Sequence, residues 1–335
     1  MAAQQRWAAF FIGRRTKMKK IVAIFSLISI VAASICLGGC GSKSSGFTVG
    51  ICQLVQHPAL DKATQGFKDV LTEEFGDSIT IEEGNASGDS ATCSTICNGY
   101  VSEGVDLIMA NATPALQAAA SATNSIPVLG TSISGYGAAL GIDDFKDVVG
   151  GNISGTSDLA PMDEQASIMK QLWPNAKTVG IIFCSGEANS VFQVEVMTEE
   201  LSKLGFKVNT YSFADSNDVS LVTKTACEEN DLLYVPTDNV AASCADAINA
   251  VVTDTKTPAF AAEEDPCKVF GVATLTIDYY ELGRMTGKMA VKILKGEADI
   301  NTMPVEYFAN PVKKFNAEKA KLFSVTIPDD FEEIK

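Results

Sequence analysis

Phe47-Thr48-Val49-Gly50-Ile51-Cys52 and Thr178-Val179-Gly180-Ile181-Ile182-Phe183 are two matching apolar runs, and together they decide the fold. Each has the composition of a buried strand, and each is followed by an amphipathic segment, 58–75 after the first and 189–204 after the second. Strands that alternate with helices form parallel sheets covered on both faces. Because the pattern starts again at Thr178, the sequence predicts two α/β domains with a cleft between them.

Both halves continue this alternation. The first half has predicted strands at 79–81, 105–109 and 126–129 and predicted helices at 90–103 and 114–123. The second has strands at 206–211, 232–235 and 257–261 and helices at 219–228 and 240–253. A last strand at 269–275 leads to a long helix at 279–295, and the tail returns through 304–308.

The N-terminal segment has the features of an export signal. Lys19 and Lys20 precede an apolar stretch, 21–37, which ends in Leu37-Gly38-Gly39-Cys40. A basic region, an apolar region and small residues at the cleavage point define a signal peptide, and a cysteine at that point looks like a bacterial lipobox. We therefore expect residues 1–39 to be removed, Cys40 to be lipidated and 40–45 to form a tether. Met18 is the more natural start, and a membrane-spanning helix is the alternative reading of 21–37.

Composition limits the partners. The chain has 26 basic and 41 acidic residues, and the predicted signal peptide contains bases but no acid. A strongly acidic mature surface argues against nucleic acid and anionic lipid headgroups as partners, because both require basic patches. Outside the signal no apolar stretch is long enough to span a bilayer, so the lipid anchor is the one membrane contact expected. The length suits two domains of about 100 to 200 residues each.

Seven cysteines follow Cys40, and an odd number leaves at least one thiol free. Cys52 and Cys184 fall in predicted buried strands, where cysteine acts as a small hydrophobe. Cys93 and Cys97 share one helical face, but no second ligand pair is near, so we do not predict a metal there. A disulfide among the remaining cysteines, 227, 244 and 267, stays open.

Polar residues gather directly after the predicted strands, where open parallel sheets bind their ligands. They are hydroxyls, amides and a few acids, a set that suits a small zwitterion: hydroxyls for a carboxylate and an acid for an ammonium. They are Gln53, Gln56, His57, Asn111, Thr113, Thr131, Ser132, Ser185, Glu187, Asn189, Ser190, Thr237, Asp238, Asn239, Glu263, Glu264 and Asp265.

Several of these residues have a structural alternative. Asn111, Thr113, Asn189 and Asn239 precede predicted helices and could act as N-caps, with or without ligand contact. Asp238 is favoured as a functional residue because it directly follows a buried strand. The run 263–265 is interpreted as a solvated acidic loop, although one of its acids could meet a cation.

Catalytic and cofactor signals are weak. His57 is the only histidine, so a Ser/His/Asp arrangement would depend on it alone, and a histidine-rich metal site is impossible. No Walker motif occurs, and no GxGxxG follows the first strand, so we predict no cofactor.

Six motifs carry a resemblance to a known family. They occur in this order after the lipobox: Gln56-His57-Pro58-Ala59-Leu60-Asp61, Asn111-Ala112-Thr113-Pro114, Gly155-Thr156-Ser157-Asp158, Glu187-Ala188-Asn189-Ser190, Val235-Pro236-Thr237-Asp238-Asn239 and Asp278-Tyr279-Tyr280-Glu281-Leu282-Gly283. The chain resembles the substrate-binding lipoproteins of ABC importers, in the branch associated with tryptophan and tyrosine uptake. The resemblance covers the whole mature chain.

The resemblance implies a type I periplasmic-binding fold: two Rossmann-like α/β domains joined by three crossovers, with the ligand cleft between them. The crossovers are expected near 152–155, 277–278 and 306–307, which gives domains of 46–153 plus 278–306 and 154–277 plus 307–335. Tyr136, Phe192 and Tyr279 are candidates for an aromatic wall, with ordinary packing as the alternative. The expected ligand-binding set is Gln53, Gln56, Asn111, Thr113, Thr131, Ser132, Asp158, Asn189, Ser190, Thr237, Asp238, Asn239 and Asp278.

The predicted function is therefore that of a lipid-anchored, extracytoplasmic receptor. It would bind an aromatic amino acid (Tyr, Phe or Trp) and deliver it to an ABC permease without chemistry of its own. One alternative is a lipid-anchored α/β enzyme with a carboxylate base such as Asp158 or Asp238. Another is a surface sensor or adhesin built on the same fold.

Overall fold

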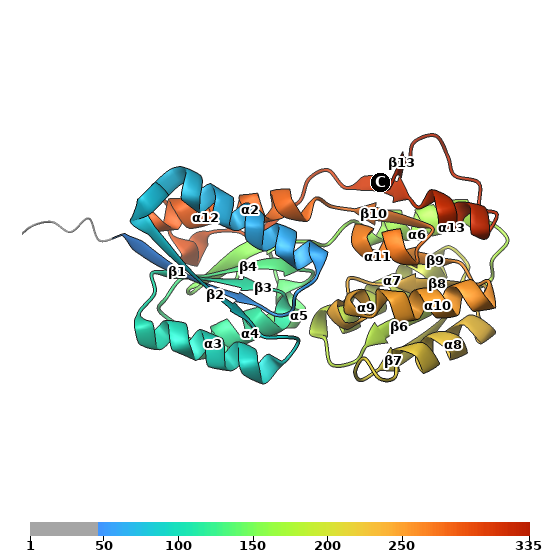
Figure 1. Ribbon diagram of the computed structural model, residues 1–335, viewed down its shortest axis with the longest axis horizontal. Helices are drawn as coiled ribbons and strands as arrows, with labels where there is room; N and C mark the ends of the chain where they lie inside the picture. The colour runs from blue at the N-terminus through green and yellow to red at the C-terminus, as the bar shows by residue number, and fades with distance from the viewer. Residues whose placement is uncertain (1–45) are drawn as a thin grey trace, which may run out of the picture. The chain divides into compact units, whose positions relative to one another are not determined.

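The computed structural model describes residues 46–335 (Figure 1). The predicted signal peptide, the lipidation site Cys40 and the tether up to residue 45 lie outside these residues. In the part of the chain that is described, no helix is both long enough and apolar enough to cross a bilayer.

The first sheet has six strands in the order β11-β5-β4-β3-β1-β2, and all neighbours run parallel. The helices α2 and α12 cover one face, and α3 and α4 cover the other (Figure 1). Its strands are β1 Phe47–Gln53, β2 Ile79–Asn85, β3 Leu107–Asn111, β4 Val128–Ile133, β5 Ile153–Ser157 and β11 Glu306–Tyr307. Its helices are α2 Pro58–Phe75, η1 Gly76–Ser78, α3 Ser90–Glu103, α4 Thr113–Ala122, α5 Tyr136–Leu140, α12 Tyr279–Leu294 and η2 Ile300–Thr302.

The second sheet has seven strands in the order β13-β12-β10-β9-β8-β6-β7, and only the β10–β12 pair is antiparallel. Its strands are β6 Thr178–Cys184, β7 Lys207–Phe213, β8 Leu232–Val235, β9 Ala259–Ala261, β10 Ala273–Thr276, β12 Val312–Phe315 and β13 Glu332–Glu333. Its helices are α6 Met162–Leu172, α7 Ala188–Lys203, α8 Val219–Glu229, α9 Asn239–Ser243, α10 Ala245–Thr255, α11 Glu264–Val269 and α13 Ala317–Leu322.

The chain crosses between the two sheets three times, as predicted. The second crossing is at 277–278, between β10 and α12. The first comes after Ser157 rather than near 152–155, because Ile153–Ser157 forms β5 beside β4 in the first sheet. The third comes after Tyr307, because Glu306 and Tyr307 pair with β5. We call residues 47–157 with 279–307 the first lobe, and 162–276 with 312–335 the second lobe.

Helix α12 returns to the first lobe and packs against α2 backbone to backbone. Two glycines permit this approach: a Cβ on Gly66 would overlap the carbonyl oxygen of Tyr280, and one on Gly283 would overlap that of Ala63. Pro58 at the first turn and the apolar face of Leu60, Phe67 and Leu71 specify α2 itself.

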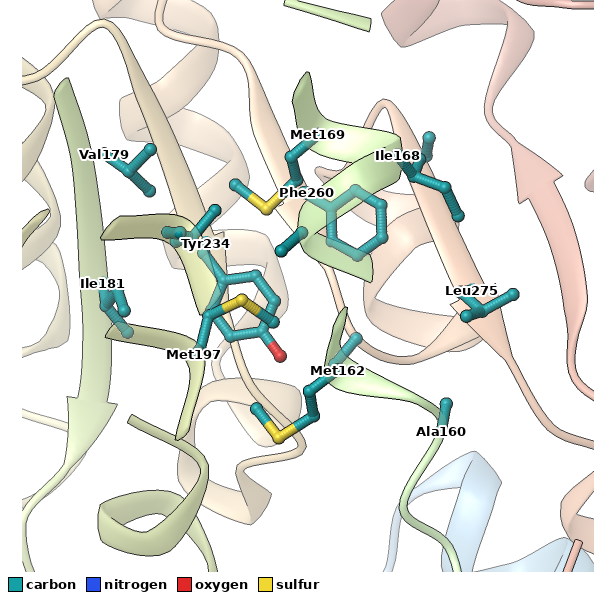
Figure 2. Close-up of a cluster of buried hydrophobic side chains, with 14 of the residues drawn as sticks. Ala160, Met162, Ile168, Met169, Val179, Ile181, Met197, Tyr234, Phe260 and Leu275 are labelled. Carbon is teal, nitrogen blue, oxygen red and sulfur yellow. The ribbon is translucent and has the colours of Figure 1, made fainter. Parts of the chain in front are cut away.

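The core of the second lobe fixes the strand ends of that lobe. Figure 2 shows Met162, Met169 and Met197 around the ring of Tyr234. Tyr234 stacks on Phe260 with ring centroids 6.1 Å apart, and its hydroxyl donates to Gln165 Oε1 at 2.8 Å. Each such buried side chain contributes about 1.5–3 kcal/mol, so β8 and β9 are held rigidly at the edge where they end.

Three local predictions were wrong in detail. The predicted strand 269–275 is β10 at 273–276, because residues 264–269 form the short helix α11. The predicted helix 240–253 is divided into α9 and α10 at Cys244. Strand β4 ends at Ile133, so Thr131 and Ser132 lie within the strand and not after it.

Candidate functional site

The ends of the strands of both lobes meet through direct contacts. His57 Nε2 lies 3.3 Å from Asn239 Oδ1, and Gln193 Nε2 donates to Ser134 Oγ at 3.2 Å. Phe192 of α7 packs on the backbone of Gly135, where a Cβ would lie 3.0 Å from its ring. The two lobes therefore close on each other at the edge that the strand-end rule selects.

Three side chains of the first lobe have buried oxygens without a hydrogen-bond partner among residues 46–335: Asn111 Oδ1, Thr113 Oγ1 and Ser132 Oγ. The Asn111 amide is fixed from behind, because its Nδ2 donates to Leu60 O at 2.9 Å and to Thr64 Oγ1 at 3.0 Å. Buried polar atoms are almost always paired, so these oxygens on β3, α4 and β4 are candidates for ligand contact.

The backbone at these positions is strained. Ala112, between Asn111 and Thr113, has φ 88° and ψ 157°, and Ser132 has φ 57°. A non-glycine residue in this region costs about 1–3 kcal/mol and is retained where the surrounding structure demands it, often at a functional site.

The second lobe contributes a braced pair of acids. Glu187 accepts hydrogen bonds from the amides of Asn189 (3.0 Å) and Asn239 (2.7 Å) and from two backbone N–H groups. Asp238 accepts from Ser190 Oγ at 2.7 Å and from two backbone N–H groups, one of which it caps at the start of α9. Both oxygens of Asp238 thus accept hydrogen bonds from its own lobe. This arrangement suits a residue that positions Ser190 better than one that contacts the ligand directly.

Glu263 is the acid that the sequence interpretation placed wrongly. It is only 4% exposed, not part of a solvated loop, and its Oε2 has no partner in the described chain. Burial raises the pKa of Glu263 well above its usual value, and the charges of Asp158, Asp265, Asp238 and Glu187 raise it further. Glu263 therefore sits among four other carboxylates.

This acid cluster lacks a buried cationic partner. Across residues 46–335, no lysine or arginine is hydrogen-bonded or ion-paired to Asp158, Glu187, Asp238 or Glu263. Burial raises the pKa of Asp158 to about 6 and that of Glu187 to about 7. It also raises the pKa of Asp238. Such a site attracts a positively charged group that can replace the missing counter-ion.

Asp158 lies at the first crossover and accepts hydrogen bonds from side chains of two separate segments. Its Oδ1 accepts from Ser134 Oγ at 2.9 Å, and its Oδ2 accepts from the hydroxyl of Tyr279 at 3.0 Å. Ser134, Gln193 and Tyr279 were not in the predicted ligand-binding set. Ser134 follows β4, and Tyr279 lies in one of the motifs of the resemblance. Only the fold shows that both bond to Asp158.

Cavities border the cluster on two sides. One, of about 370 Å³, is lined by Val55 and Pro114 of the first lobe and by Glu187 and Asn239 of the second. The other, of about 530 Å³, is lined by Ala59 of the first lobe and by Glu263 and Tyr279. Each is large enough for an amino-acid-sized molecule.

Four predicted site residues lie elsewhere or are used otherwise. Gln53 and the exposed Gln56 line a separate pocket of about 360 Å³ beside α2. Thr131 Oγ1 pairs with Thr156 Oγ1 at 3.2 Å. Asp278 is exposed and caps α12 by accepting from Glu281 N at 3.1 Å. The other predicted residues, whose contact with a ligand stays a prediction, are all buried or half-buried: Asn111, Thr113, Ser132, Asp158, Asn189, Ser190, Thr237, Asp238 and Asn239.

The remaining candidates have ordinary structural roles. Tyr136 stacks on Phe145 in the first-lobe core, and its hydroxyl bonds to the carbonyls of Gly130 and Thr156. Burial lowers the pKa of His57, and no serine, threonine or cysteine hydroxyl or thiol bonds to its ring within the described residues. The seven cysteines after Cys40 are all free thiols, and no cluster of three ligating side chains suited to a metal occurs in that part of the chain.

Comparisons with known proteins agree with this geometry. Residues 48–333 match the family described as ABC transporter substrate binding protein. A curated tyrosine-binding protein from Clostridioides difficile (strain R20291) is 34% identical over 306 residues, 86% of this chain and 88% of that protein.

Two solved structures are informative. The ABC domain in complex with L-Trp from Streptococcus pneumoniae is 32% identical, with a TM-score of 0.83 over 87% of this chain and 100% of that one. The ligand-free, open structure of a substrate-binding protein with adhesive properties from Clostridium difficile is 37% identical, with a TM-score of 0.67 over 86% of this chain and 99% of that one. The open, ligand-free structure has the higher sequence identity but the lower TM-score. The lobes here are therefore arranged more as in the tryptophan complex.

Proposed function

This chain belongs to the family of ABC transporter substrate binding proteins, and from this premise we propose that it binds one aromatic amino acid between its lobes. Proteins of this family act outside the cytoplasm, bind a small molecule for an ABC transporter and are not enzymes. We further propose that lipidated Cys40 holds the chain at the membrane beside its permease.

One observation carries the proposal: the buried oxygens without a hydrogen-bond partner include both hydroxyl groups and carboxylate or amide acceptors. Thr113 and Ser132 offer hydroxyl donors, which suit a carboxylate. Glu263 Oε2 and Asn189 Oδ1 offer acceptors, which suit an ammonium. A zwitterionic amino acid presents these two groups at one end, so it would satisfy both lobes at once and stabilise their closure.

The aromatic side chain is supported by the relatives. One is described as a tyrosine-binding protein, and a structure of similar fold and 32% identity contains L-Trp. Phe192 and Tyr279 are the remaining candidates for a ring contact, since Tyr136 packs in the first-lobe core.

Isothermal titration calorimetry of the chain from residue 46 tests the proposal. L-tyrosine, L-phenylalanine and L-tryptophan should each be assayed for one-to-one binding. Tyramine lacks the carboxylate and 3-(4-hydroxyphenyl)propionate lacks the ammonium, so each should bind at least about a hundredfold more weakly than tyrosine. Saturation at about 100 times the Kd should raise the stability by about 2.7 kcal/mol. Equal affinity for tyrosine, tyramine and 3-(4-hydroxyphenyl)propionate, or no binding of any aromatic amino acid, would contradict the proposal.

Adhesion is a second candidate, favoured by the 37% identical relative that is described as having adhesive properties. Beads coated with the chain from residue 46 should then be retained on epithelial cells more than beads coated with a binding protein of unrelated fold. Equal retention would remove this candidate without affecting the first.

A further inference from the structure

Four buried side chains form one continuous hydrogen-bond chain from the hinge to both lobes. The hydroxyl of Tyr279, at the second crossover, donates to Asp158 Oδ2 at 3.0 Å. Ser134 Oγ, in the first lobe, donates to Asp158 Oδ1 at 2.9 Å, and Gln193 Nε2, in the second lobe, donates to Ser134 Oγ at 3.2 Å. We call these four residues the closure chain.

We propose that the closure chain couples closing of the lobes to ligand retention, with Asp158 as a positioning residue that joins two crossovers. The inference rests on the proposed function, but Ser134 and Gln193, which form its one link between the lobes, are not among the proposed ligand contacts. The proposal assigns to the hinge one contact that forms as the lobes meet, the hydrogen bond from Gln193 to Ser134.

The geometry supports this role because only one link of the chain crosses between the lobes. Gln193 is held in its own lobe, where its Oε1 accepts from Thr237 N at 3.0 Å and its Nε2 also donates to Thr237 O at 3.1 Å. Asp158 is fixed at the edge of the first lobe by its backbone N–H, which donates to Ile133 O at 3.3 Å. The donor on one lobe is thus set before Ser134 on the other lobe reaches it.

Burial makes the links strong and specific. All four side chains are buried, and two of the three hydrogen bonds end on a carboxylate. Charge-assisted hydrogen bonds are stronger than neutral ones, and a buried carboxylate that loses a donor is costly. Opening the lobes removes only the Gln193 donor from Ser134, and the two bonds to Asp158 hold Ser134 in the position where it meets Gln193.

Asp158 also lies next to the proposed ammonium site. Its charge acts on Glu263 and on Tyr279, and Tyr279 lines the same cavity of about 530 Å³ as Glu263. The other charged and titratable groups that face this region are Asp238, Glu187, Glu264, Asp265, Asp278, Tyr280, Lys314 and Glu332, with Lys62 on α2 and His57 just before that helix. A ligand in the cluster therefore acts on the same carboxylate that holds the hinge.

The test uses Tyr279→Phe and Ser134→Ala, each of which deletes one hydroxyl of the chain. Tyr234→Phe is the matched control, because Tyr234 is equally buried and loses one hydrogen bond, to Gln165, in the second-lobe core. Ser134→Thr keeps the hydroxyl and should rescue the alanine variant. Dissociation of tyrosine is followed by stopped-flow fluorescence of Trp173, and lobe separation by small-angle X-ray scattering.

We expect Tyr279→Phe and Ser134→Ala to speed tyrosine dissociation about tenfold, as the loss of one buried hydrogen bond predicts. The scattering of the saturated variants should shift toward a more open form. Tyr234→Phe should lower the Tm but leave the dissociation rate unchanged. If all three variants lower the Tm and none changes the dissociation rate or the scattering, the closure role is wrong.

Failure of the proposed function gives a different result. If the wild-type protein binds no aromatic amino acid, the proposed function is wrong. The closure role can still be tested by small-angle X-ray scattering of the proteins without ligand. A more open average in Tyr279→Phe than in Tyr234→Phe would then support the closure chain, and identical scattering would overturn it.

Discussion

Gly283 on α12 lies directly against the carbonyl oxygen of Ala63 on α2, so closely that a Cβ on the glycine would overlap this oxygen. The contact joins two helices that are more than 200 positions apart in the chain. Because α12 begins at the second crossover, this contact also fixes where the hinge leaves the first lobe.

Gly283→Ala should therefore destabilise the protein by about 3 kcal/mol, because the backbone atom it meets cannot move aside. Gly99→Ala is the control: Gly99 lies in α3 with open space around it, so alanine there should stabilise by about 0.5–1 kcal/mol. Urea denaturation of both variants measures the difference. Equal effects of the two substitutions would contradict the close packing of α2 and α12.

Glu263→Gln should weaken tyrosine binding about tenfold or more, because it removes the negative charge from the proposed ammonium site. Without ligand the variant should be at least as stable as the wild type, since a buried carboxylate oxygen without a partner is lost. Glu264→Gln is the matched control, because Glu264 pairs with Lys314 at 2.7 Å in a partly exposed position. Calorimetry and thermal melts measure the two effects. An unchanged Kd in Glu263→Gln would place the ammonium elsewhere.

Binding should release protons and strengthen as pH rises from about 5 to 8. Burial raises the pKa of Asp158 to about 6 and that of Glu187 to about 7, above the usual values near 4. Without ligand, the folded protein therefore holds more protons than the unfolded chain between about pH 4 and 7. The contribution of these groups to stability falls as pH rises through that window.

A bound ammonium favours the ionised carboxylates, so the affinity should rise by up to about tenfold per pH unit for each proton released. Calorimetry in two buffers of different ionisation enthalpy counts these protons. Asp158→Asn should release fewer. Proton uptake on binding would show that the ligand does not bring a positive charge to this cluster.

Thiol reagents should label the native protein slowly. Six of the seven thiols after Cys40 are buried, and only Cys244 is partly exposed. A chain starting at residue 46 should therefore react first at Cys244 with Ellman's reagent and at all seven sites once unfolded in guanidinium. A yield of fewer than seven thiols in the unfolded, unreduced protein would reveal a disulfide.

Much of the fold could be predicted from the sequence, because strands alternating with amphipathic helices leave few arrangements. The repeated runs at Phe47 and Thr178 do form the matching strands β1 and β6. Local pattern could not place the first crossover, because β5 becomes part of the first sheet only through pairing with β4 and β11.

The sequence places the candidate site at the edge where the two lobes meet, but it does not give the contacts of each residue there. Glu263 follows the strand β9, and the strand-end rule selects it together with Asp238. Three acids in a row nevertheless indicate a solvated loop, so the expected ligand-binding set does not include Glu263, which the fold buries. Gln53 ends β1, as the strand-end rule requires, but its side chain bonds to Thr64 and Asp61 beside α2.

The topology has a consequence for the chain as a whole. Each lobe is assembled from two separate stretches, and β11 joins the first sheet near the end of the sequence. A truncation at any of the three crossovers therefore deprives at least one lobe of a strand or helix that belongs to its core. Neither lobe exists as one contiguous gene segment, and the first cannot complete its sheet until almost the entire polypeptide has been exported.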